Sequence, residues 1–286
     1  MTVLVIGGSG MIGSHVTRAL VDAGASLRAM APSQVEEGRL GALGVHDVVR
    51  GDLADPASLA PAMRAVRRLF LLTPYSADQA ALETAAVDAA VSAGVEHVVK
   101  LSAYGVRWDI AVSRPHRRVE EHLAAAGISH TLLRPDNLLD NLLAETAAIT
   151  GGTLYRPPGA CPAAWVAAHD IGAVAAHELL AEHAVGGALT LTGPEPLTWD
   201  ELADTVSAAT GRPLRVQYVP PDAWIAAAVN AGLPAHYAPG LVELHAAITA
   251  AGPTPPSPDI AGVLGRAPST AGTWARDQLL PALNAA

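Results

Sequence analysis

The segment that most constrains the fold is a run of aliphatic residues directly followed by three spaced glycines, Gly7, Gly10 and Gly13. After a strand, the first glycine of such a series makes a tight turn, the second lets the backbone approach a pyrophosphate, and the third lets a helix pack closely on the strand. The N–H groups at the start of that helix, near Met11 and Ile12, would face the phosphates. The segment therefore predicts a dinucleotide-binding βαβ unit at the start of the chain.

Short aliphatic runs alternate with longer, alanine-rich segments through the first half of the chain. This alternation is typical of a parallel sheet with helices on both faces. Glycines stand where four of the helices should end, at Gly24, Gly44, Gly94 and Gly127. The expected strands are residues 3–6, 27–30, 47–50, 68–72, 97–101 and 130–134. The predicted fold class is α/β, a Rossmann-type doubly wound parallel sheet.

The second half of the chain is richer in helices and prolines. Two short apolar runs, residues 165–167 and 188–191, are expected to return as strands to the sheet edge. We therefore expect a dinucleotide-binding Rossmann lobe over residues 1–150. A smaller, mostly helical substrate-binding lobe is expected over residues 151–286, with parts of 165–192 returning to the sheet.

Three Ser or Thr residues are followed three positions later by Glu or Gln, a spacing that predicts a capping box at a helix start. The pairs are Ser33 with Glu36, Ser76 with Gln79, and Thr198 with Glu201.

Charge and composition exclude several classes of partner. The 286 residues carry 18 Lys+Arg against 27 Asp+Glu, and a net charge of −9 gives no electrostatic footprint for nucleic acid. The longest uncharged stretch, residues 223–242, contains prolines, so no membrane span is expected. The single cysteine, Cys161, permits no disulfide pair and is expected to be a small packing residue. We expect a cytoplasmic monomer or homodimer that binds a small molecule and no metal.

The end of the second expected strand bears on the choice of cofactor. An acid there would bond the ribose 2′-hydroxyl of NAD and repel the 2′-phosphate of NADP, whereas an arginine would accept that phosphate. Residues 27–34 contain no carboxylate, which favours NADP and leaves NAD possible. Arg28, Ser33 and Gln34 are the polar candidates at this position, although Arg28 could equally be a solvent-facing strand residue.

Two further loops follow strands at the same edge of the sheet, where ligands bind in open α/β sheets. Asp52 and Leu53 follow the third strand, and Asp52 could reach the adenine or cap its own loop. Thr73 and Pro74 follow the fourth strand and could border the ribose or the nicotinamide.

Several segments together resemble the NmrA-like family of atypical short-chain dehydrogenases/reductases. They are Gly7-x-x-Gly10-x-x-Gly13, Gly51-Asp52-Leu53, Leu72-Thr73-Pro74, residues 99–103 (VKLSA), His116-x-x-x-Glu120, Leu133-Arg134-Pro135, His169-Asp170-Ile171 and residues 191–195 (LTGPE). The resemblance implies a Rossmann lobe with a small C-terminal substrate lobe. The family includes NADPH-dependent quinone reductases, triphenylmethane-dye reductases and dinucleotide-binding redox sensors. Its members that prefer NADP often carry an arginine just after the second strand, where this chain has Ala31 and Pro32.

The tyrosine–lysine dyad of the larger superfamily is missing, because no tyrosine has a lysine four residues later. The candidates for proton transfer near the end of the fifth strand are Ser102, Tyr104 and His116. His116 and Glu120 share a helix face, so Glu120 could orient the imidazole, although the pair could instead be a surface contact. Lys100 is expected to be structural, with its ammonium group reaching a loop carboxylate.

Aromatic residues are scarce, and several of them lie in the C-terminal part. These are Trp165, Trp199, Trp224, Tyr237 and Trp274. We expect most of them to pack a core, and the join at residues 232–239 could form a lid.

The preferred hypothesis is an NAD(P)H-dependent reductase that transfers hydride to a quinone-like or conjugated aromatic small molecule. Such acceptors need little acid catalysis because their reduced oxygens are themselves acidic, which suits a site without the dyad. Two alternatives stay open. One is a non-redox enzyme on the same fold, a cyclase or dehydratase with Tyr104 or His116 as acid and base, and the other is a non-catalytic NAD(P) redox sensor.

Overall fold

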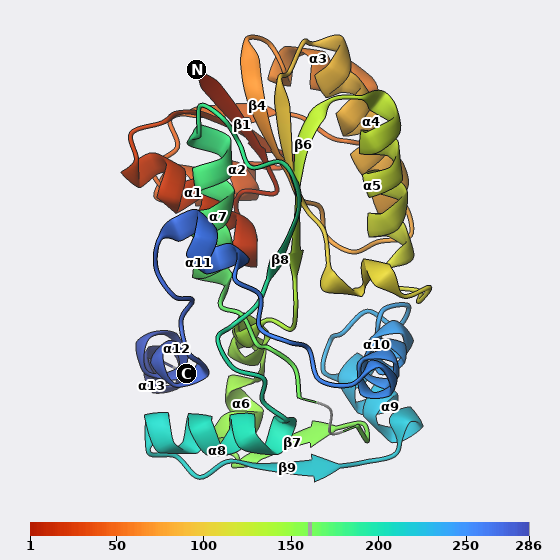
Figure 1. Ribbon diagram of the computed structural model, residues 1–286, viewed down its shortest axis with the longest axis vertical. Coiled ribbons are helices and arrows are strands. Elements are labelled where there is room, and N and C mark those ends of the chain that lie inside the picture. Colours follow the sequence, from red (N-terminus) through yellow and green to blue (C-terminus); the bar gives the residue numbers. More distant parts are fainter. Residues whose placement is uncertain (160–161, 286) are drawn as a thin grey trace.

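A parallel sheet of seven strands forms the upper half of the molecule in Figure 1, a computed structural model that describes residues 1–159 and 162–285. The strands are β1 Thr2–Ile6, β2 Ser26–Ala31, β3 Asp47–Arg50, β4 Val66–Leu71, β5 His97–Leu101, β6 Ser129–Pro135 and β8 Gly187–Leu191. Their order is β3-β2-β1-β4-β5-β6-β8, so the direction of winding changes between β1 and β4. In open α/β sheets, this switch point is where ligands bind.

The predicted fold class is confirmed, and the six N-terminal strands lie within two residues of their expected bounds. The four helix-ending glycines all adopt positive φ, as expected: Gly24, Gly44, Gly94 and Gly127. The run at residues 188–191 forms the edge strand β8. The run at residues 165–167 is not a strand, since Val166 makes only an isolated bridge with Leu138. It is apolar because it is buried.

Helices cover both faces of this sheet. α1 Met11–Asp22 and α7 Ala168–Leu180 pack on one face, and α3 Pro56–Ala62, α4 Gln79–Ser92 and α5 Arg114–Ala126 pack on the other (Figure 1). α2 Gln34–Ala42 lies against β2 and β3. α1 and α7 approach so closely at Gly172 that a Cβ there would lie 2.6 Å from the Cβ of His15.

The C-terminal elements form most of the lower half of Figure 1. They are η2 Leu139–Glu145, α6 Thr146–Thr150, β7 Thr153–Arg156, α8 Trp199–Thr210, β9 Arg215–Tyr218, α9 Pro221–Asn230, α10 Ala238–Ala251, α12 Ala271–Trp274, η3 Ala275–Leu279 and α13 Leu280–Ala285. Two short helices lie with the sheet half instead: η1 Tyr104–Arg107 near β6, and α11 Asp259–Leu264 against α7 and β8. β7 and β9 pair in parallel as a second, two-stranded sheet. The boundary at residue 150 stays a prediction. Leu139 and Ile149, which precede it, pack in the same hydrophobic cluster as α8 and α12.

The tryptophans of this half are mainly packing residues. Trp165 and Trp274 are buried in the C-terminal cluster, and Trp199 packs edge-on against Trp165 with ring centres 4.5 Å apart. Trp224 is tied to the β7 backbone, because its indole N–H donates to the carbonyl of Tyr155 at 3.0 Å. These contacts give the half its own apolar interior.

One of the three predicted capping boxes is complete. At Thr198 and Glu201, each side chain accepts a hydrogen bond from the other residue's backbone N–H. The Ser33 box is half formed: the hydroxyl accepts from the N–H of Glu36 at 3.2 Å, but the carboxylate turns elsewhere. The prediction at Ser76 is wrong, since α4 begins without a side-chain cap.

Within residues 1–159 and 162–285, no helix is long and apolar enough to cross a membrane. The same part of the chain contains no group of three His, Cys, Asp or Glu side chains that could hold a metal ion. Cys161 lies outside the described residues.

A buried histidine at the start of β5 links stability to pH. His97 on β5 is bonded through Nδ1 to Ser129 at 2.8 Å and through Nε2 to Thr131 at 3.0 Å. Thr131 in turn donates to Glu178 of α7. Burial lowers the pKa of His97 to about 4, so the folded chain holds a neutral imidazole at neutral pH.

We expect the free energy of unfolding to fall as the pH drops from about 6.5 to about 4, because the unfolded chain binds the His97 proton first. The expected loss is about 3 kcal/mol, because a pKa difference of one unit corresponds to about 1.4 kcal/mol. In urea unfolding at a series of pH values, His97→Gln should flatten this part of the curve. An unchanged slope in the variant would assign the pH dependence to other groups.

Candidate active site

The glycine loop after β1 brings three elements together. Gly7 has φ +81°, and a Cβ on it would lie 2.3 Å from the carbonyl oxygen of Leu72, at the end of β4. A Cβ on Gly13 would lie 1.9 Å from the carbonyl oxygen of Gly7. Larger side chains are therefore excluded at both positions by the protein's own packing, which fixes α1 on β1 and β1 beside β4.

Gly10 differs from these two glycines. A Cβ on Gly10 would meet only the carbonyl oxygen of Gly7, at an ordinary 3.6 Å, and its backbone is extended. α1 begins at Met11 with no side-chain cap, so the N–H groups of Met11 and Ile12 stay available at the helix start. Protein packing does not explain the glycine, whereas a pyrophosphate against the backbone would. These residues fit the diphosphate of a dinucleotide.

The structure places Arg28 away from this loop. Arg28 lies three residues before the end of β2, about 10 Å from the carboxyl edge of the sheet. Its guanidinium pairs with Asp47 at 2.9 Å and donates to the carbonyl of Arg64 at 2.8 Å. The prediction that Arg28 contacts a 2′-phosphate is therefore wrong. Ser33 lies at the correct edge, where its hydroxyl caps α2.

An acid that sequence reasoning missed lies beside the glycine loop. The Glu36 carboxylate accepts a hydrogen bond from the hydroxyl of Ser9 and pairs with Arg39 at 2.9 Å. An acid about 20 residues beyond the glycines is the usual ribose ligand of this fold. Only residues 27–34 were expected to matter, and Glu36 comes two positions later because it is carried on the first turn of α2.

Asp52 and Leu53 occupy the loop after β3. The Asp52 carboxylate caps its own loop by accepting from the N–H of Ala54 at 2.9 Å, and it stays exposed at the sheet edge. Leu53 turns its side chain into the core under α3, so only its backbone faces the crevice. Pro74 is exposed after β4, and Thr73 before it is buried.

A cavity of about 270 Å³ opens where β4, β5 and β6 end. Ile12 of the glycine loop helix lines one side, and all three sequence candidates, Ser102, Tyr104 and His116, line it as well. α10 closes it from the C-terminal half through Tyr237, whose ring lies 4.6 Å from that of Tyr75. The cavity thus joins the predicted cofactor loop to the predicted proton-transfer residues.

α10 is held against the sheet half by close contacts. A Cβ on Gly240 would lie 2.5 Å from Val112, and Glu243 accepts a hydrogen bond from the backbone N–H of Ala111 at 3.1 Å. The chain before α10 carries His236, which stacks on Tyr75. The lid expected at residues 232–239 stays a prediction, and its position over the cavity fits that role.

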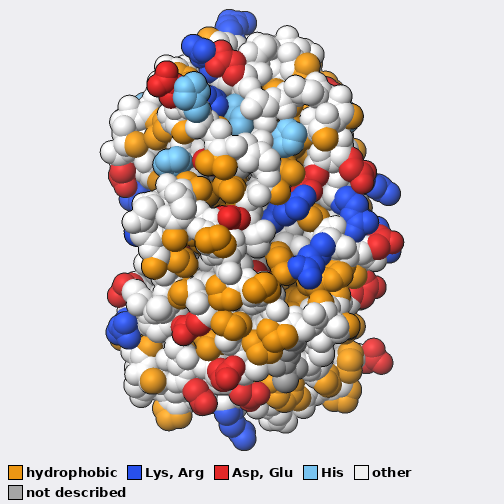
Figure 2. Space-filling model, in the orientation of Figure 1, with side chains coloured by type: hydrophobic (Ala, Val, Ile, Leu, Met, Phe, Trp, Pro, Cys, Tyr) orange, Lys and Arg blue, Asp and Glu red, His pale blue; other side chains and the backbone are white. Residues whose placement is uncertain are grey.

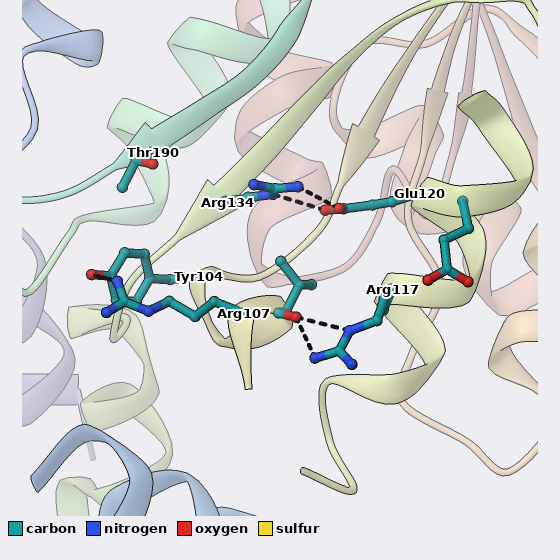
Figure 3. A pocket seen from close by; sticks show the side chains of 8 residues that line it. Tyr104, Arg107, Arg117, Glu120, Arg134 and Thr190 are labelled. Carbon is teal, nitrogen blue, oxygen red and sulfur yellow. Dashed lines mark hydrogen bonds and ion pairs between the residues drawn. The ribbon is translucent and has the colours of Figure 1, made fainter. Parts of the chain in front are cut away.

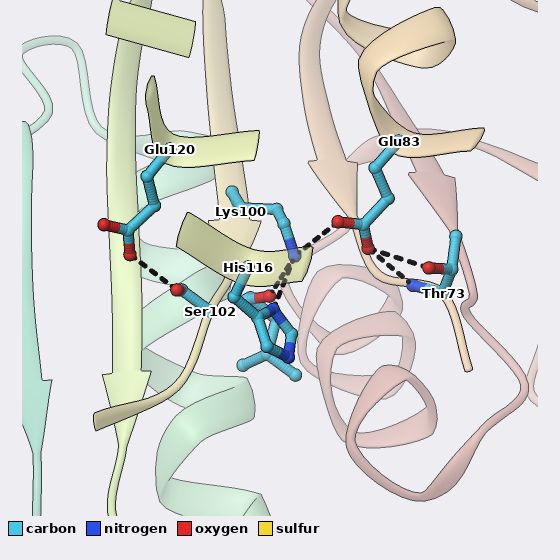
Figure 4. Close-up of polar contacts among 7 residues, drawn as sticks. Thr73, Glu83, Lys100, Ser102, His116 and Glu120 are labelled. Atoms are coloured by element: carbon cyan, nitrogen blue, oxygen red, sulfur yellow. Dashed lines mark hydrogen bonds and ion pairs between the residues drawn. The ribbon is translucent and has the colours of Figure 1, made fainter. Parts of the chain in front are cut away.

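A buried ion pair lies beneath the cavity (Figure 4). Lys100 and Glu83 are both 0% exposed, and the Lys100 ammonium lies 2.8 Å from the Glu83 carboxylate. Glu83 also accepts from the hydroxyl of Thr73 at 2.8 Å. The ammonium lies 3.3 Å from Nδ1 of His116 and donates to the carbonyl of Leu101. The lysine partner is thus a helix carboxylate rather than the loop carboxylate expected from sequence.

This contact fixes the tautomer of His116. The Lys100 ammonium, paired with Glu83, has only donors, so Nδ1 of His116 accepts a hydrogen bond from it and Nε2 carries the ring hydrogen. Burial, and secondarily the Lys100 charge, hold the pKa of His116 well below its usual value. His116 is therefore a neutral donor at the cavity wall.

Glu120 has a different partner from the one expected. It accepts from Ser102 at 2.5 Å and from Nε of Arg134 at 3.0 Å, so it does not orient His116. The prediction that Glu120 positions the imidazole is wrong, because Lys100 reaches His116 from the strand below. Tyr104 is also engaged, since its hydroxyl accepts from Arg107.

Comparison with known proteins agrees with this geometry. A family model described as the NmrA-like family matches residues 1–252. An NAD(P)H azoreductase of Xenophilus azovorans is 32% identical over 277 residues, which are 96% of this chain and 94% of that protein. A (4-alkanoyl-5-oxo-2,5-dihydrofuran-3-yl)methyl phosphate reductase of Streptomyces griseus subsp. griseus is 32% identical over 246 residues, 84% and 83% of the two chains. Quinone oxidoreductase 2 of Escherichia coli is 26% identical over 237 residues, 81% and 82% of the two chains.

Among solved structures, the Citrobacter sp. triphenylmethane reductase complexed with NADP(H) superposes with a TM-score of 0.81 at 25% identity, covering 97% of this chain and 99% of that chain. The motifs, the fold and the family model lead to one conclusion: the chain belongs to the NmrA-like family.

Proposed function

We propose that the protein is an NAD(P)H-dependent reductase, with NADPH as the preferred cofactor, that reduces a quinone-like or conjugated aromatic small molecule. The observation that carries the proposal is the cavity of about 270 Å³ that joins the glycine loop to a neutral histidine donor near the switch point of the sheet. The relatives named as azoreductase and quinone oxidoreductase support the same class of acceptor.

The residues that would hold the cofactor lie along the carboxyl edge of the sheet. The N–H groups of Met11 and Ile12 would bind the diphosphate, with Asp52 near the adenosine and Thr73 near the nicotinamide. When bound, NADPH supplies the hydride that reduces the acceptor.

His116 would donate a hydrogen bond to the substrate that is reduced. Its Nε2–H would form a hydrogen bond with the acceptor oxygen or nitrogen on which negative charge develops. A neutral hydrogen-bond donor suffices here, because the oxygen of a reduced quinone is acidic enough to carry the negative charge without being protonated during the step. Lys100 and Glu83 act as positioning residues, since both are buried and neither lines the cavity.

The first prediction concerns His116. NADPH oxidation should be measured at 340 nm with a panel of quinones and azo dyes, where the proposal requires turnover. We expect His116→Ala to lower kcat by about tenfold or more. His122→Ala, on the same helix but outside the cavity, should leave kcat nearly unchanged. Because the pKa of His116 is low, kcat/KM should show no inflection near pH 6.5.

No turnover with any acceptor would remove the reductase proposal. NADPH binding without turnover would then favour a sensor, and activity that survives removal of all nicotinamide would favour a non-redox enzyme.

The second prediction concerns the tautomer. Nitrogen NMR of histidine-labelled protein should show His116 with its proton on Nε2. In Glu83→Gln/Lys100→Met, which removes both charges of the buried pair together, the Nδ1–H form should appear. If the spectrum of His116 is the same in both proteins, Lys100 does not set the tautomer.

The third prediction concerns cofactor choice. Glu36→Gln removes a negative charge next to Ser9, where a 2′-phosphate would approach. We expect Kd for NADPH to fall by about threefold to tenfold, because the repulsion of the 2′-phosphate is relieved. Kd for NADH should rise, because the ribose 2′-hydroxyl loses its charged hydrogen-bond acceptor. Glu37→Gln removes an exposed charge from the same helix turn and should change neither value. Calorimetric titration of the wild type and both variants with each cofactor measures these dissociation constants. Equal effects of the two variants would place Glu36 outside the cofactor site.

A further inference from the structure

A second cavity, of about 420 Å³, lies on the outer side of Tyr104 (Figure 3). Tyr104 lines both this cavity and the inner one that holds His116. Three arginines from three different elements line the outer cavity: Arg107 of η1, Arg117 of α5 and Arg134 of β6. Figure 2 shows basic side chains gathered near the middle of one face of the molecule. Three arginines at one cavity are unusual in a chain of net charge −9.

Arg134 lines this cavity and is already paired with a carboxylate. It forms a two-bond ion pair with Glu120, and the buried Glu120 also accepts from Ser102, so this carboxylate is already neutralised and saturated with donors. Arg134 lies opposite Thr190 in the β6–β8 register, and both side chains reach the cavity. Within the part of the chain that the structure describes, no hydrogen bond occupies the Thr190 hydroxyl.

Among the described residues, neither Arg107 nor Arg117 forms an ion pair with a carboxylate. The Arg107 charge acts at longer range on the buried Asp136, where it partly offsets the rise in pKa that burial causes. Arg117 donates through Nε and Nη2 to the carbonyl of Val106 at 3.0 and 2.7 Å. The Arg107 guanidinium packs on the rings of Tyr104 and Trp108, with centroids 4.6 and 4.9 Å away. Both guanidinium groups are therefore held in place by neutral partners.

Such a set of donors suits an oxyanion. Guanidinium groups bind sulfonate, phosphate and carboxylate oxygens through paired, charge-assisted hydrogen bonds. Glu121 is the remaining acid at the cavity, and it is exposed. The side chains that line the cavity sum to one positive charge, because three arginines stand against Glu120 and Glu121. Asp259 accepts a hydrogen bond from the backbone N–H of Thr190 at 2.7 Å, but it does not line the cavity.

We propose that this outer cavity binds an anionic oxygen group carried by the acceptor, so that the preferred substrates are conjugated aromatic molecules with a sulfonate, phosphate or carboxylate substituent. The reducible ring would lie in the inner cavity, and the anionic group would pass Tyr104 to reach Arg107, Arg134 and Thr190. The assignment of the ring rests on the proposed reductase function, whereas the anion site rests on the arginines alone.

Paired acceptors test the proposal. NADPH oxidation is followed with 1,4-naphthoquinone and with its 2-sulfonate, using the wild type, Arg107→Gln and Arg118→Gln. Arg118 is an exposed arginine of α5 that does not line the cavity, so its variant has the same net charge as Arg107→Gln. We expect Arg107→Gln to raise KM for the sulfonate about tenfold and KM for the neutral quinone less than about twofold, with Arg118→Gln near wild type for both. Equal KM changes for the two quinones would overturn the anion site.

A binding measurement separates this proposal from the reductase function. Calorimetry of the full chain with naphthalene-1-sulfonate, compared with naphthalene-1-sulfonamide, needs no turnover. The sulfonate should bind more tightly than the sulfonamide, and Arg107→Gln should remove most of the difference. If quinones are not reduced but this difference exists, the reductase proposal fails and the anion site stands. If the two ligands bind alike, or Arg107→Gln leaves the difference intact, the anion site is wrong even where reduction occurs.

Discussion

The contact between the glycine loop and the end of β4 determines where every other part of the site can lie. The loop lies directly on the Leu72 carbonyl, and α1 starts almost against β1. Such packing leaves no room for a Cβ at Gly7 or Gly13. This close approach opens the crevice at the switch point and directs the first N–H groups of α1 into it. The loops after β4, β5 and β6 then meet at the same edge, so residues far apart in sequence share one cavity.

A buried polar network gives this cavity its chemistry. Lys100 and Glu83 are fully buried between the sheet and α4, and removing one charge of such a pair typically costs about 3–5 kcal/mol. The pair therefore has a fixed geometry, and the Lys100 ammonium presents the same face to His116 at all times. A second chain, from Ser102 through Glu120 to Arg134, runs beside it and connects the inner cavity to the outer one. Preorganised donors of this kind lower the cost of charge that develops during reaction.

Much of the fold could be predicted from the sequence, because strand, helix and glycine repeat with a regular period and each rule acts locally. The segment at residues 165–167 shows the limit of that reasoning. Its apolar residues are buried between the two halves rather than paired in a sheet, and burial alone cannot distinguish the two cases. The prediction for Arg28 was wrong for a related reason. Arg28 lies near the glycine loop in sequence, but a ligand at the sheet edge is reached only from the carboxyl end of β2, three residues further on.

The site residues found by motif were those on the loops at the sheet edge. Their partners came from other elements: Glu83 from α4 meets Lys100 from β5, and Arg134 from β6 takes Glu120 away from His116. These pairings depend on strand order and helix placement, which no local spacing contains. The outer cavity could not be predicted for the same reason: Arg134 belongs to the Leu133-Arg134-Pro135 motif, but Arg107 and Arg117 belong to no motif, and only the folded chain brings the three together.

Gly10 offers the most direct test of the whole account, because the protein's own packing leaves room for a side chain there and a bound diphosphate would not. NADPH binding should be measured by calorimetry for the wild type and for Gly10→Val, with thermal unfolding as the check on folding. The account predicts nearly equal melting temperatures and a Kd for NADPH raised by about tenfold or more in the variant. Equal affinity in two equally stable proteins, or no NADPH binding by the wild type at millimolar concentration, would contradict it.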